Sequence, residues 1–425
     1  MGGCAAPRGV ADMVPDATKR APSHPVLTLA LLSTGHAVIH ALSALLPLVY
    51  PIIIVEFALR PADVGTFIAV TTAVGGLMQI AYGFVTRYVA RPLLLAGGQL
   101  VFGLSLLFAG SSTSVAQLLA GISASRIGAS PQHPVGNALL SDAFPAERRG
   151  FAISAHIAGG NLGTIAVPLL AGSGLLGAGL LATIGWQRTI GLIGLPALVI
   201  GVLIGLFVHE DHRAYRRAAR SGPSVRAQLG EVAGRRDLRY ILLASLAAAG
   251  GRGLDIVAPF MLLYLSGPLG IDRATVSMLY LILLVGAVIG PLLAGWLSDR
   301  YGRQRVLVAY YLVSAAGIFA FLLAGSNLVL LVPLLIPFGT AVFSESPVLQ
   351  AYLADRADGP IRDVAFSVYF TAAFGIGAGW ALVIGQVVER YDYPWAFGVM
   401  AASYLVAALL LRAVPSAPVR TIERS

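Results

Sequence analysis

Residues 273–305 read RATVSMLYLILLVGAVIGPLLAGWLSDRYGRQR. The first 25 of them are mostly apolar, and a helix needs about 20 apolar residues to cross the hydrocarbon core of a bilayer. A short polar stretch with three arginines, residues 298–305, follows, and the next apolar run begins at once. An apolar run, a short basic loop and another apolar run together predict two membrane-spanning helices.

The whole chain is similarly rich in apolar residues and poor in charged ones. It has 425 residues, of which 57% are hydrophobic and only 12% are charged. A soluble globular chain carries about 25% charged residues, so the composition excludes an ordinary soluble protein. The only cysteine is Cys4, which excludes an intramolecular disulfide.

Twelve apolar runs have the length of a membrane-spanning helix. We therefore predict an all-α membrane protein with twelve transmembrane helices. The spans are 27–55, 63–86, 92–111, 114–139, 150–173, 187–208, 239–265, 273–297, 304–324, 327–353, 363–388 and 394–413.

The basic residues give these spans an orientation, because Lys and Arg accumulate on the cytoplasmic side. With both termini inside, the tails and inner loops hold 23 of the 29 basic residues. The outer loops hold only Arg60, Arg188, Arg273 and Arg390. The net charge of +9 then reflects orientation in a bacterial inner membrane, and we expect no nucleic-acid partner.

One long polar stretch, residues 210–238, divides the chain into two sets of six spans. A repeat supports this division: GFVTRYVAR at Gly83 to Arg91 and GWLSDRYGR at Gly295 to Arg303 start 212 positions apart. We predict a disordered cytoplasmic tail (1–25), an N-terminal six-helix bundle (26–209), a cytoplasmic linker (210–238), a C-terminal six-helix bundle (239–413) and a second tail (414–425). Two six-helix halves repeated in parallel are typical of one large class of transporters.

The stretch Gly295 to Arg305 resembles the signature loop of the major facilitator superfamily. We expect Gly295 to permit close helix packing, Asp299 to pair with an arginine or cap a helix, and Gly302 to permit a tight turn. The resemblance implies that both copies of this loop help the two halves to lock and release. The motif residues are Gly83, Arg87 and Arg91 in the first copy and Gly295, Asp299, Arg300, Gly302 and Arg303 in the second.

The first half, over roughly residues 33–170, resembles a narrower group, the fosmidomycin-resistance-type efflux transporters. The residues that carry this resemblance are His36, Tyr50-Pro51, Glu56-Phe57, Gly128-Ala129, His133-Pro134, Arg148-Arg149-Gly150, Gly159-Gly160-Asn161-Leu162-Gly163 and Pro168. His40 stands where this group usually has an acidic residue, and Arg87 stands where the loop motif usually has aspartate. The resemblance implies proton-driven efflux of a drug or a toxic metabolite.

Polar side chains inside the spans are the best candidates for a site, because burying a charge in a bilayer costs at least about 2.5–3.5 kcal/mol. Span four carries Arg126, Ser130, His133 and Asn137 at helical spacing, which predicts one polar stripe. Arginine can hold a carboxylate or a phosphonate in a bidentate fork. The stripe is therefore interpreted as a substrate-binding face. The alternative is a structural role, in which Arg126 joins neighbouring helices by binding backbone carbonyls or a carboxylate.

His36 and His40 lie one turn apart on span one and face the same way. We predict that His36 contacts substrate and that His40 takes part in proton coupling; the alternative is a hydrogen-bonded structural pair. The spacing also suits zinc, but no acidic or cysteine ligand is near in sequence, so we predict no metal and no cofactor. His156 and Asn161 on span five are further substrate-binding candidates.

Span seven carries Arg252 and Asp255, and span ten carries Glu345. Arg252 and Asp255 are three positions apart, so the simplest interpretation is a local ion pair. Asp255, Glu345, Arg252 and His40 form the predicted proton-coupling set. For Glu345 the alternative is a pair with Arg126 or Arg252.

These features predict a secondary transporter, a proton-coupled exporter of a small polar or anionic compound. Its partners would be a small-molecule substrate, protons and the lipid bilayer, and we expect a monomer. Proton-coupled uptake of an organic acid or another nutrient is the alternative. An enzyme or a sensor is disfavoured, since the chain lacks a convincing catalytic set and a soluble domain.

Overall fold

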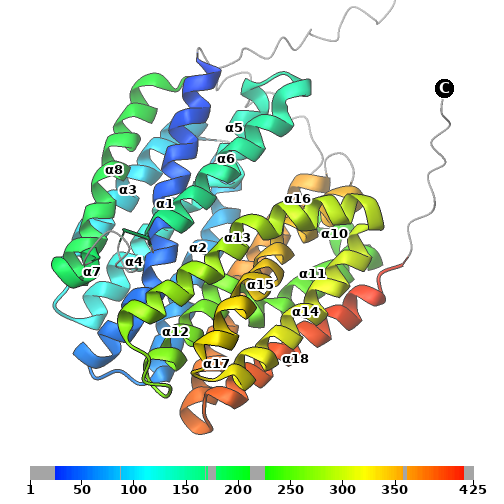
Figure 1. Ribbon diagram of the computed structural model, residues 1–425. Coiled ribbons are helices and arrows are strands. Elements are labelled where there is room, and N and C mark those ends of the chain that lie inside the picture. Colours follow the sequence, from blue (N-terminus) through cyan, green and yellow to red (C-terminus); the bar gives the residue numbers. More distant parts are fainter. Residues whose placement is uncertain are drawn as a thin grey trace, which may run out of the picture.

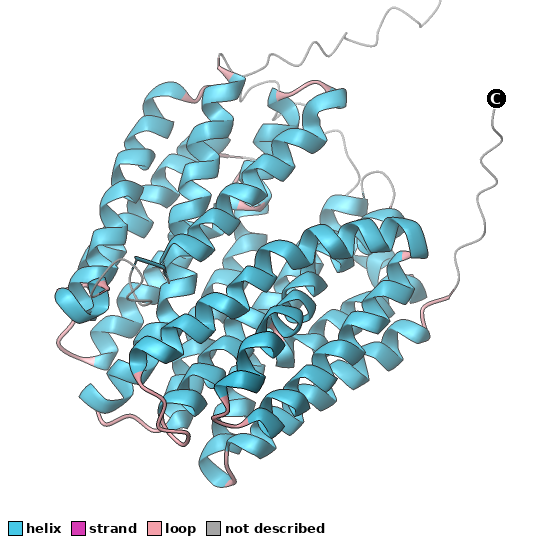
Figure 2. Ribbon diagram, viewed as in Figure 1, coloured by secondary structure: helices cyan, strands magenta, loops and turns pink. Residues whose placement is uncertain are grey.

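The computed structural model describes residues 24–86, 88–167, 169–170, 179–210, 225–357 and 361–415. Throughout these ranges the regular structure is helical, without a strand (Figure 2). The two predicted tails, except residues 24–25 and 414–415, lie outside the described residues, as do linker residues 211–224 and Arg87.

The first half of the chain forms one group of helices (Figure 1). Its elements are α1 (Pro25–Glu56), α2 (Pro61–Val85), α3 (Arg91–Ala109), α4 (Val115–Ala129), the 3₁₀ turn η2 (Ser130–Gln132), α5 (Pro134–Ala143), α6 (Ala146–Val167), α7 (Leu180–Thr183) and α8 (Gly185–Phe207).

The second half forms a group beside it (Figure 1). Its elements are α10 (Val225–Gly234), α11 (Arg236–Ala248), η4 (Ala249–Gly251), η5 (Gly253–Val257), α12 (Ala258–Ser266), α13 (Arg273–Tyr301), α14 (Arg303–Ala324), α15 (Leu328–Arg356), α16 (Ile361–Phe370), η6 (Thr371–Ile376), α17 (Gly379–Arg390) and α18 (Tyr393–Arg412). The α-helix α10 occupies the last part of the predicted linker.

Ten helical segments of the described chain are long and apolar enough to cross a membrane. The other two predicted spans are shorter as continuous helices: span four is broken at η2, and span five includes the shorter apolar helix Ala152–Val167. Large apolar side chains on the outside of the helices, such as Leu323, Val329 and Leu292, are 74–87% exposed. A chain in water would bury such residues, so this surface is suited to lipid, and the predicted all-α membrane fold is confirmed.

Three crossing segments change their helix type partway along. Span four contains the 3₁₀ turn η2, span seven contains the 3₁₀ turn η4 and the π-helix η5, and span eleven contains the π-helix η6. Proline explains the first break, because Pro131 and Pro134 cannot donate the backbone hydrogen bonds of a continuous helix. Such interruptions are frequent at functional sites, and these three border the polar residues described below.

The two halves meet closely along α2, where glycines bring its backbone against that of η6 and α17. A methyl group added at Gly65 would lie 3.0 Å from the Cα of Gly385, and one added at Gly76 would lie 2.7 Å from the Cα of Gly375. Arg60, which precedes α2, also forms an ion pair of 2.9 Å with Glu389 of α17. The contacts of Arg60 and Gly65 lie toward the end of the molecule where α1 finishes, which is the predicted outer side, and the contact of Gly76 lies nearer the middle of α2.

At the opposite end, matching ion pairs reveal the internal repeat. Arg91 pairs with Asp142 at 3.0 Å in the first half, and Arg303 pairs with Asp355 at 3.2 Å in the second. Arg91 and Arg303 are 212 positions apart, and Asp142 and Asp355 are 213 apart. Each pair ties the start of a half's third crossing segment to the end of its fourth, so the sequence repeat corresponds to a repeated contact.

The second copy of the loop motif behaves as predicted at two positions and differently at a third. Asp299 pairs with Arg303 at 2.5 Å, and Gly302 has φ of +93°, a turn that favours glycine. Arg300 lies over the rings of Trp296 and Tyr301. Close packing at Gly295 was the wrong prediction, since a methyl group there would meet no other atom within 4 Å. In the first copy, Gly83 lies near the end of α2.

Candidate functional site

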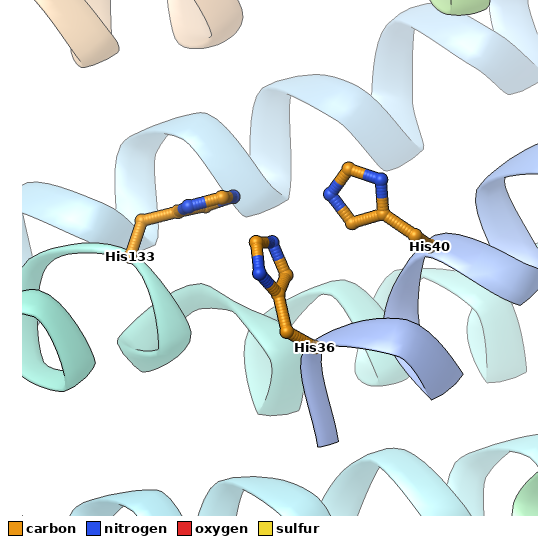
Figure 3. A group of neighbouring side chains, drawn as sticks. All are labelled: His36, His40 and His133. Carbon is orange, nitrogen blue, oxygen red and sulfur yellow. The ribbon is translucent and has the colours of Figure 1, made fainter. Parts of the chain in front are cut away.

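Four histidines of the N-terminal half lie together (three of them are drawn in Figure 3). The ring of His36 is centred 4.5 Å from the ring of His40, 4.8 Å from that of His133 and 4.5 Å from that of His156. His36 and His40 come from α1, His133 joins η2 to α5, and His156 lies on α6. The predicted shared orientation of His36 and His40 is confirmed, and two further crossing segments complete the cluster.

Hydrogen bonds fix how two of these rings lie. Nδ1 of His36 is 2.9 Å from the carbonyl oxygen of His156, which can only accept, so Nδ1 of His36 carries the proton. Nδ1 of His40 is 3.0 Å from the hydroxyl oxygen of Thr164, which in turn donates to the carbonyl of Gly160. The Thr164 oxygen is thereby left as the acceptor for His40. In both neutral rings the lone pair is therefore on Nε2.

Glycines allow α6 to approach α1 at this cluster. A methyl group at Gly160 would lie 2.9 Å from Cε1 of His36, and one at Gly159 would lie 2.6 Å from the carbonyl oxygen of Ser33. The interpretation of these glycines as close-packing positions is confirmed. Asn161 follows on the same helix, but the described hydrogen bonds do not join it to the histidines.

The predicted polar stripe of span four is interrupted. The helix stops at Ala129, and η2 intervenes before α5 begins at Pro134, so simple helical spacing does not relate all four residues. The Ser130 hydroxyl, which has one proton to donate, lies 2.9 Å from the carbonyl oxygen of Gly75 and 2.6 Å from that of Arg126, so it links this segment to α2. Asn137 lies beyond the break on α5, with its Oδ1 buried and without a hydrogen-bond partner. Arg126 and His133 contact side chains of α1, Ser43 and His36 respectively, so the predicted single stripe is divided.

Arg126 and Asp255, from opposite halves, line one small void. Nη1 of Arg126 donates to the Ser43 hydroxyl at 3.0 Å, and its Nε is buried without a partner. The void has room for about one water molecule; Tyr50 and Thr72 also line it. None of the ion pairs among the described residues includes Arg126 or Asp255.

Arg252 is paired with Glu345 instead of Asp255. Its Nη2 lies 3.4 Å from Oε1 of Glu345, and its Nη1 donates to the carbonyl oxygen of Ala373 at 2.6 Å. The predicted local pair with Asp255 is wrong because span seven is not α-helical there: Arg252 has an extended ψ of 132° between η4 and the π-helix. Oε2 of Glu345 remains buried without a partner.

Aromatic rings from span eleven connect these groups. Phe370 stacks on His133 across the two halves, with ring centres 6.2 Å apart, and Phe374 lies 4.6 Å from the guanidinium carbon of Arg252. Asp255 and Arg252 line a second void of similar size beside Ala373. The site is thus a polar and aromatic layer between the halves.

Ser43, Tyr50 and Phe370 are site residues that were not predicted from the sequence. Ser43 and Tyr50 continue the face of α1 that carries His36 and His40, at intervals of four, three and seven residues, and this periodicity was the available signal. Phe370 gave no such signal, because only the packing of the halves brings it to His133.

Several known proteins are similar to the chain. The 4-hydroxybenzoate transporter PcaK of Acinetobacter baylyi is 25% identical over 376 residues, which cover 80% of this chain and 79% of that protein. A probable 4-methylmuconolactone transporter of Cupriavidus pinatubonensis is 24% identical over 373 residues, covering 85% of this chain and 84% of that protein.

Solved structures share the fold. A variant of the nucleoside transporter NupG superimposes with a TM-score of 0.74 at 15% identity, covering 92% of this chain and 100% of that one. The D-xylose-proton symporter gives a TM-score of 0.71 at 15% identity, covering 92% and 98%. The family model described as Major Facilitator Superfamily matches residues 32–255 and 241–424. The chain therefore belongs to the major facilitator superfamily and is a multi-pass membrane protein of that transporter family.

Proposed function

We propose that the chain is a proton-coupled transporter of a small organic carboxylate in the cytoplasmic membrane of a bacterium. The observation that carries this proposal is the Arg126 guanidinium, which lines a void between the halves and has no acidic partner among the described ion pairs. A guanidinium inside a membrane needs a counter-charge or several hydrogen bonds. Arg126 has one hydroxyl partner and a free Nε, so a carboxylate would complete its hydrogen bonding.

An aromatic carboxylate suits this site particularly well. Phe366, Phe370 and Phe374 form a row of stacked rings along span eleven, with successive centres 6.4 and 6.1 Å apart. Aromatic rings favour stacking partners in addition to apolar contact. The relatives named for 4-hydroxybenzoate support the same cargo class.

The Arg252–Glu345 pair provides a means of coupling to protons. While Glu345 is ionised, it neutralises Arg252. A proton on Glu345 removes that attraction and leaves Arg252 able to attract an anion. Proton binding and carboxylate binding then favour each other, which is the linkage that cotransport in one direction requires. Asp255 beside Arg126 is the second candidate carrier, and His40 is the third.

This linkage favours symport, and hence uptake along an inward proton gradient. The first-half resemblance favours the alternative, proton-driven efflux, and its motif residues His36, His133 and Gly160 belong to the histidine cluster. In either direction, rocking of the halves about a site at mid-membrane would expose it alternately. We further propose that both termini are cytoplasmic, that the working unit is a monomer and that the chain catalyses no covalent reaction.

Radiolabelled 4-hydroxybenzoate in proteoliposomes tests the proposal. We expect accumulation when the lumen is alkaline, together with proton entry that a lumenal pH dye reports, at clamped membrane potential. Proton movement opposite to the substrate would establish antiport, and accumulation indifferent to the pH gradient would refute coupling. We expect R126A to weaken substrate binding at least about tenfold and R126K to retain part of it, since lysine keeps the charge but not the fork.

A further inference from the structure

We propose that His36, His40 and His133 bind one zinc ion. Each offers one ring nitrogen, and these three nitrogens lie within 4.8 Å of one another (Figure 3). Imidazole suits zinc and related divalent transition metals, and three histidines with an open fourth position form a recognised type of zinc site. His133 is 93 positions from His40 and reaches it only through the fold, so the spacing of the histidines along the chain does not reveal the third ligand.

The distances require a modest contraction. Zinc–nitrogen bonds are about 2.0–2.1 Å, so tetrahedral ligand atoms lie about 3.4 Å apart. Each ring must therefore shift by roughly 1 Å from its present place. His133 can shift most easily, since it stands between the 3₁₀ turn η2 and α5 and not inside a continuous helix.

The hydrogen bonds already prepare two of the rings for a metal. Nδ1 of His36 is held by the carbonyl of His156, and Nδ1 of His40 is held by the Thr164 hydroxyl. Metal-binding histidines almost always donate their second ring N–H in this way, which orients the ring and fixes its tautomer. The remaining Nε2 of His36 is buried and has no hydrogen-bond partner. A buried nitrogen acceptor without a hydrogen-bond partner, on a ring whose tautomer is fixed, is suited to bind a metal ion.

The close packing of the four histidines determines the protonation state in which they can bind the ion. Four imidazoles with ring centres 4.5–6.3 Å apart cannot all carry positive charge. Neutral imidazole is the form that binds metal. Arg126 donates to Ser43, which follows His40 by about one turn of α1, so the fourth zinc position is suited to an anionic ligand or water. Zinc binding itself does not depend on the proposed carboxylate transport.

Zinc binding to the full-length protein tests the proposal. The protein should be purified with an affinity tag that contains no histidine, and zinc titrated against a chromophoric chelator. We expect one zinc ion per chain, and X-ray absorption at the zinc edge should show three imidazole ligands. H36N, H40N and H133N should each weaken binding about 100-fold or more, beyond the 10–100-fold range known for outer-shell changes. H209N is the matched control, because His209 is exposed beyond the end of α8.

Thr164 is a positioning residue for His40, and it provides a second test. T164V should weaken zinc binding about tenfold, and T164S should restore it, since serine keeps the hydroxyl. Absence of stoichiometric zinc from the unaltered protein would overturn the proposal, and so would undiminished binding in all three histidine variants. A zinc site without proton-coupled transport would refute only the proposed function, and transport without zinc binding would refute only the metal site.

Discussion

Arg60 and Glu389 join the two halves of the molecule at one end: Nη1 of Arg60 lies 2.9 Å from Oε1 of Glu389. Arg60 also holds Asp63, with its Nη2 3.1 Å from Oδ1 of that residue. Each named ion pair at the opposite end, in contrast, joins residues of one half: Arg91 pairs with Asp142, and Arg303 with Asp355. The structure therefore corresponds to a state closed on the predicted outer side.

Removing the charge of Glu389 should favour the state open on that side. Because Arg60 is well exposed, water and salt screen the pair, and the population should change only a few-fold in E389Q. Spin labels at the exposed residues Val55 and Tyr391, with Cys4 replaced by serine, would report the distance between the halves. E231Q, which changes an exposed residue of α10, should leave the distance distribution unaltered. An unchanged distribution in E389Q would show that the pair does not contribute to closure.

A side chain at Gly76 should force the two halves apart near the middle of α2, where that helix packs on η6. A methyl group there would lie 2.7 Å from the Cα of Gly375, and backbone atoms cannot turn aside as a side chain can. Overpacking of this kind costs about 1–3 kcal/mol, so G76A should shift the labelled distance and slow transport. G97A is the control, since a methyl group at Gly97 of α3 would meet no atom within 4 Å. Equal transport rates in both variants would contradict the tight approach of α2 to span eleven.

Much of this fold could be predicted from the sequence, because the forces that define it act locally. An apolar run of about 20 residues must be helical in a bilayer, since no water is present to satisfy its backbone. Repetition of Gly83–Arg91 at Gly295–Arg303 then indicates two halves. Helical spacing also correctly placed His36 beside His40.

The site was harder to predict, because helical spacing fails wherever the helix is interrupted. The π-helix at η5 directs Arg252 toward Glu345 and away from Asp255, and the turn at η2 divides the stripe that begins at Arg126. Contacts between segments far apart in the chain, such as His133 with Phe370, leave no periodic trace in one sequence. These interruptions coincide with the polar layer, and departures from regular helical geometry are expected at a functional site.

Gly302 and Gly295 should respond oppositely to alanine. Gly302 has φ of +93°, which an alanine adopts only with strain of about 1–3 kcal/mol. Gly295 is helical and has open space around it, and alanine favours a helix by up to about 1 kcal/mol over glycine. Thermal unfolding in detergent should therefore show a lowered midpoint for G302A and an unchanged or raised midpoint for G295A. A drop of similar size in both would restore the close-packing interpretation of Gly295.

Substitution of Glu345 by glutamine should separate proton coupling from substrate movement. Glutamine has the shape of a protonated glutamate, so E345Q should still exchange labelled for unlabelled substrate across the membrane. Accumulation driven by a pH gradient should be lost, because the group that binds the proton is gone. D255N serves as the comparison: if Asp255 is the carrier, it will lose accumulation and E345Q will keep it.

The competing explanation for any loss in E345Q is structural, and it makes a different prediction. Glu345 is almost fully buried and neutralises Arg252, so removing one partner of such a pair can cost about 3–5 kcal/mol. A purely structural pair would lower the unfolding midpoint and abolish exchange and accumulation together, and E345Q/R252M would recover both stability and exchange. Retained exchange with lost accumulation in E345Q, at an unfolding midpoint close to that of the unaltered protein, would instead assign proton coupling to Glu345.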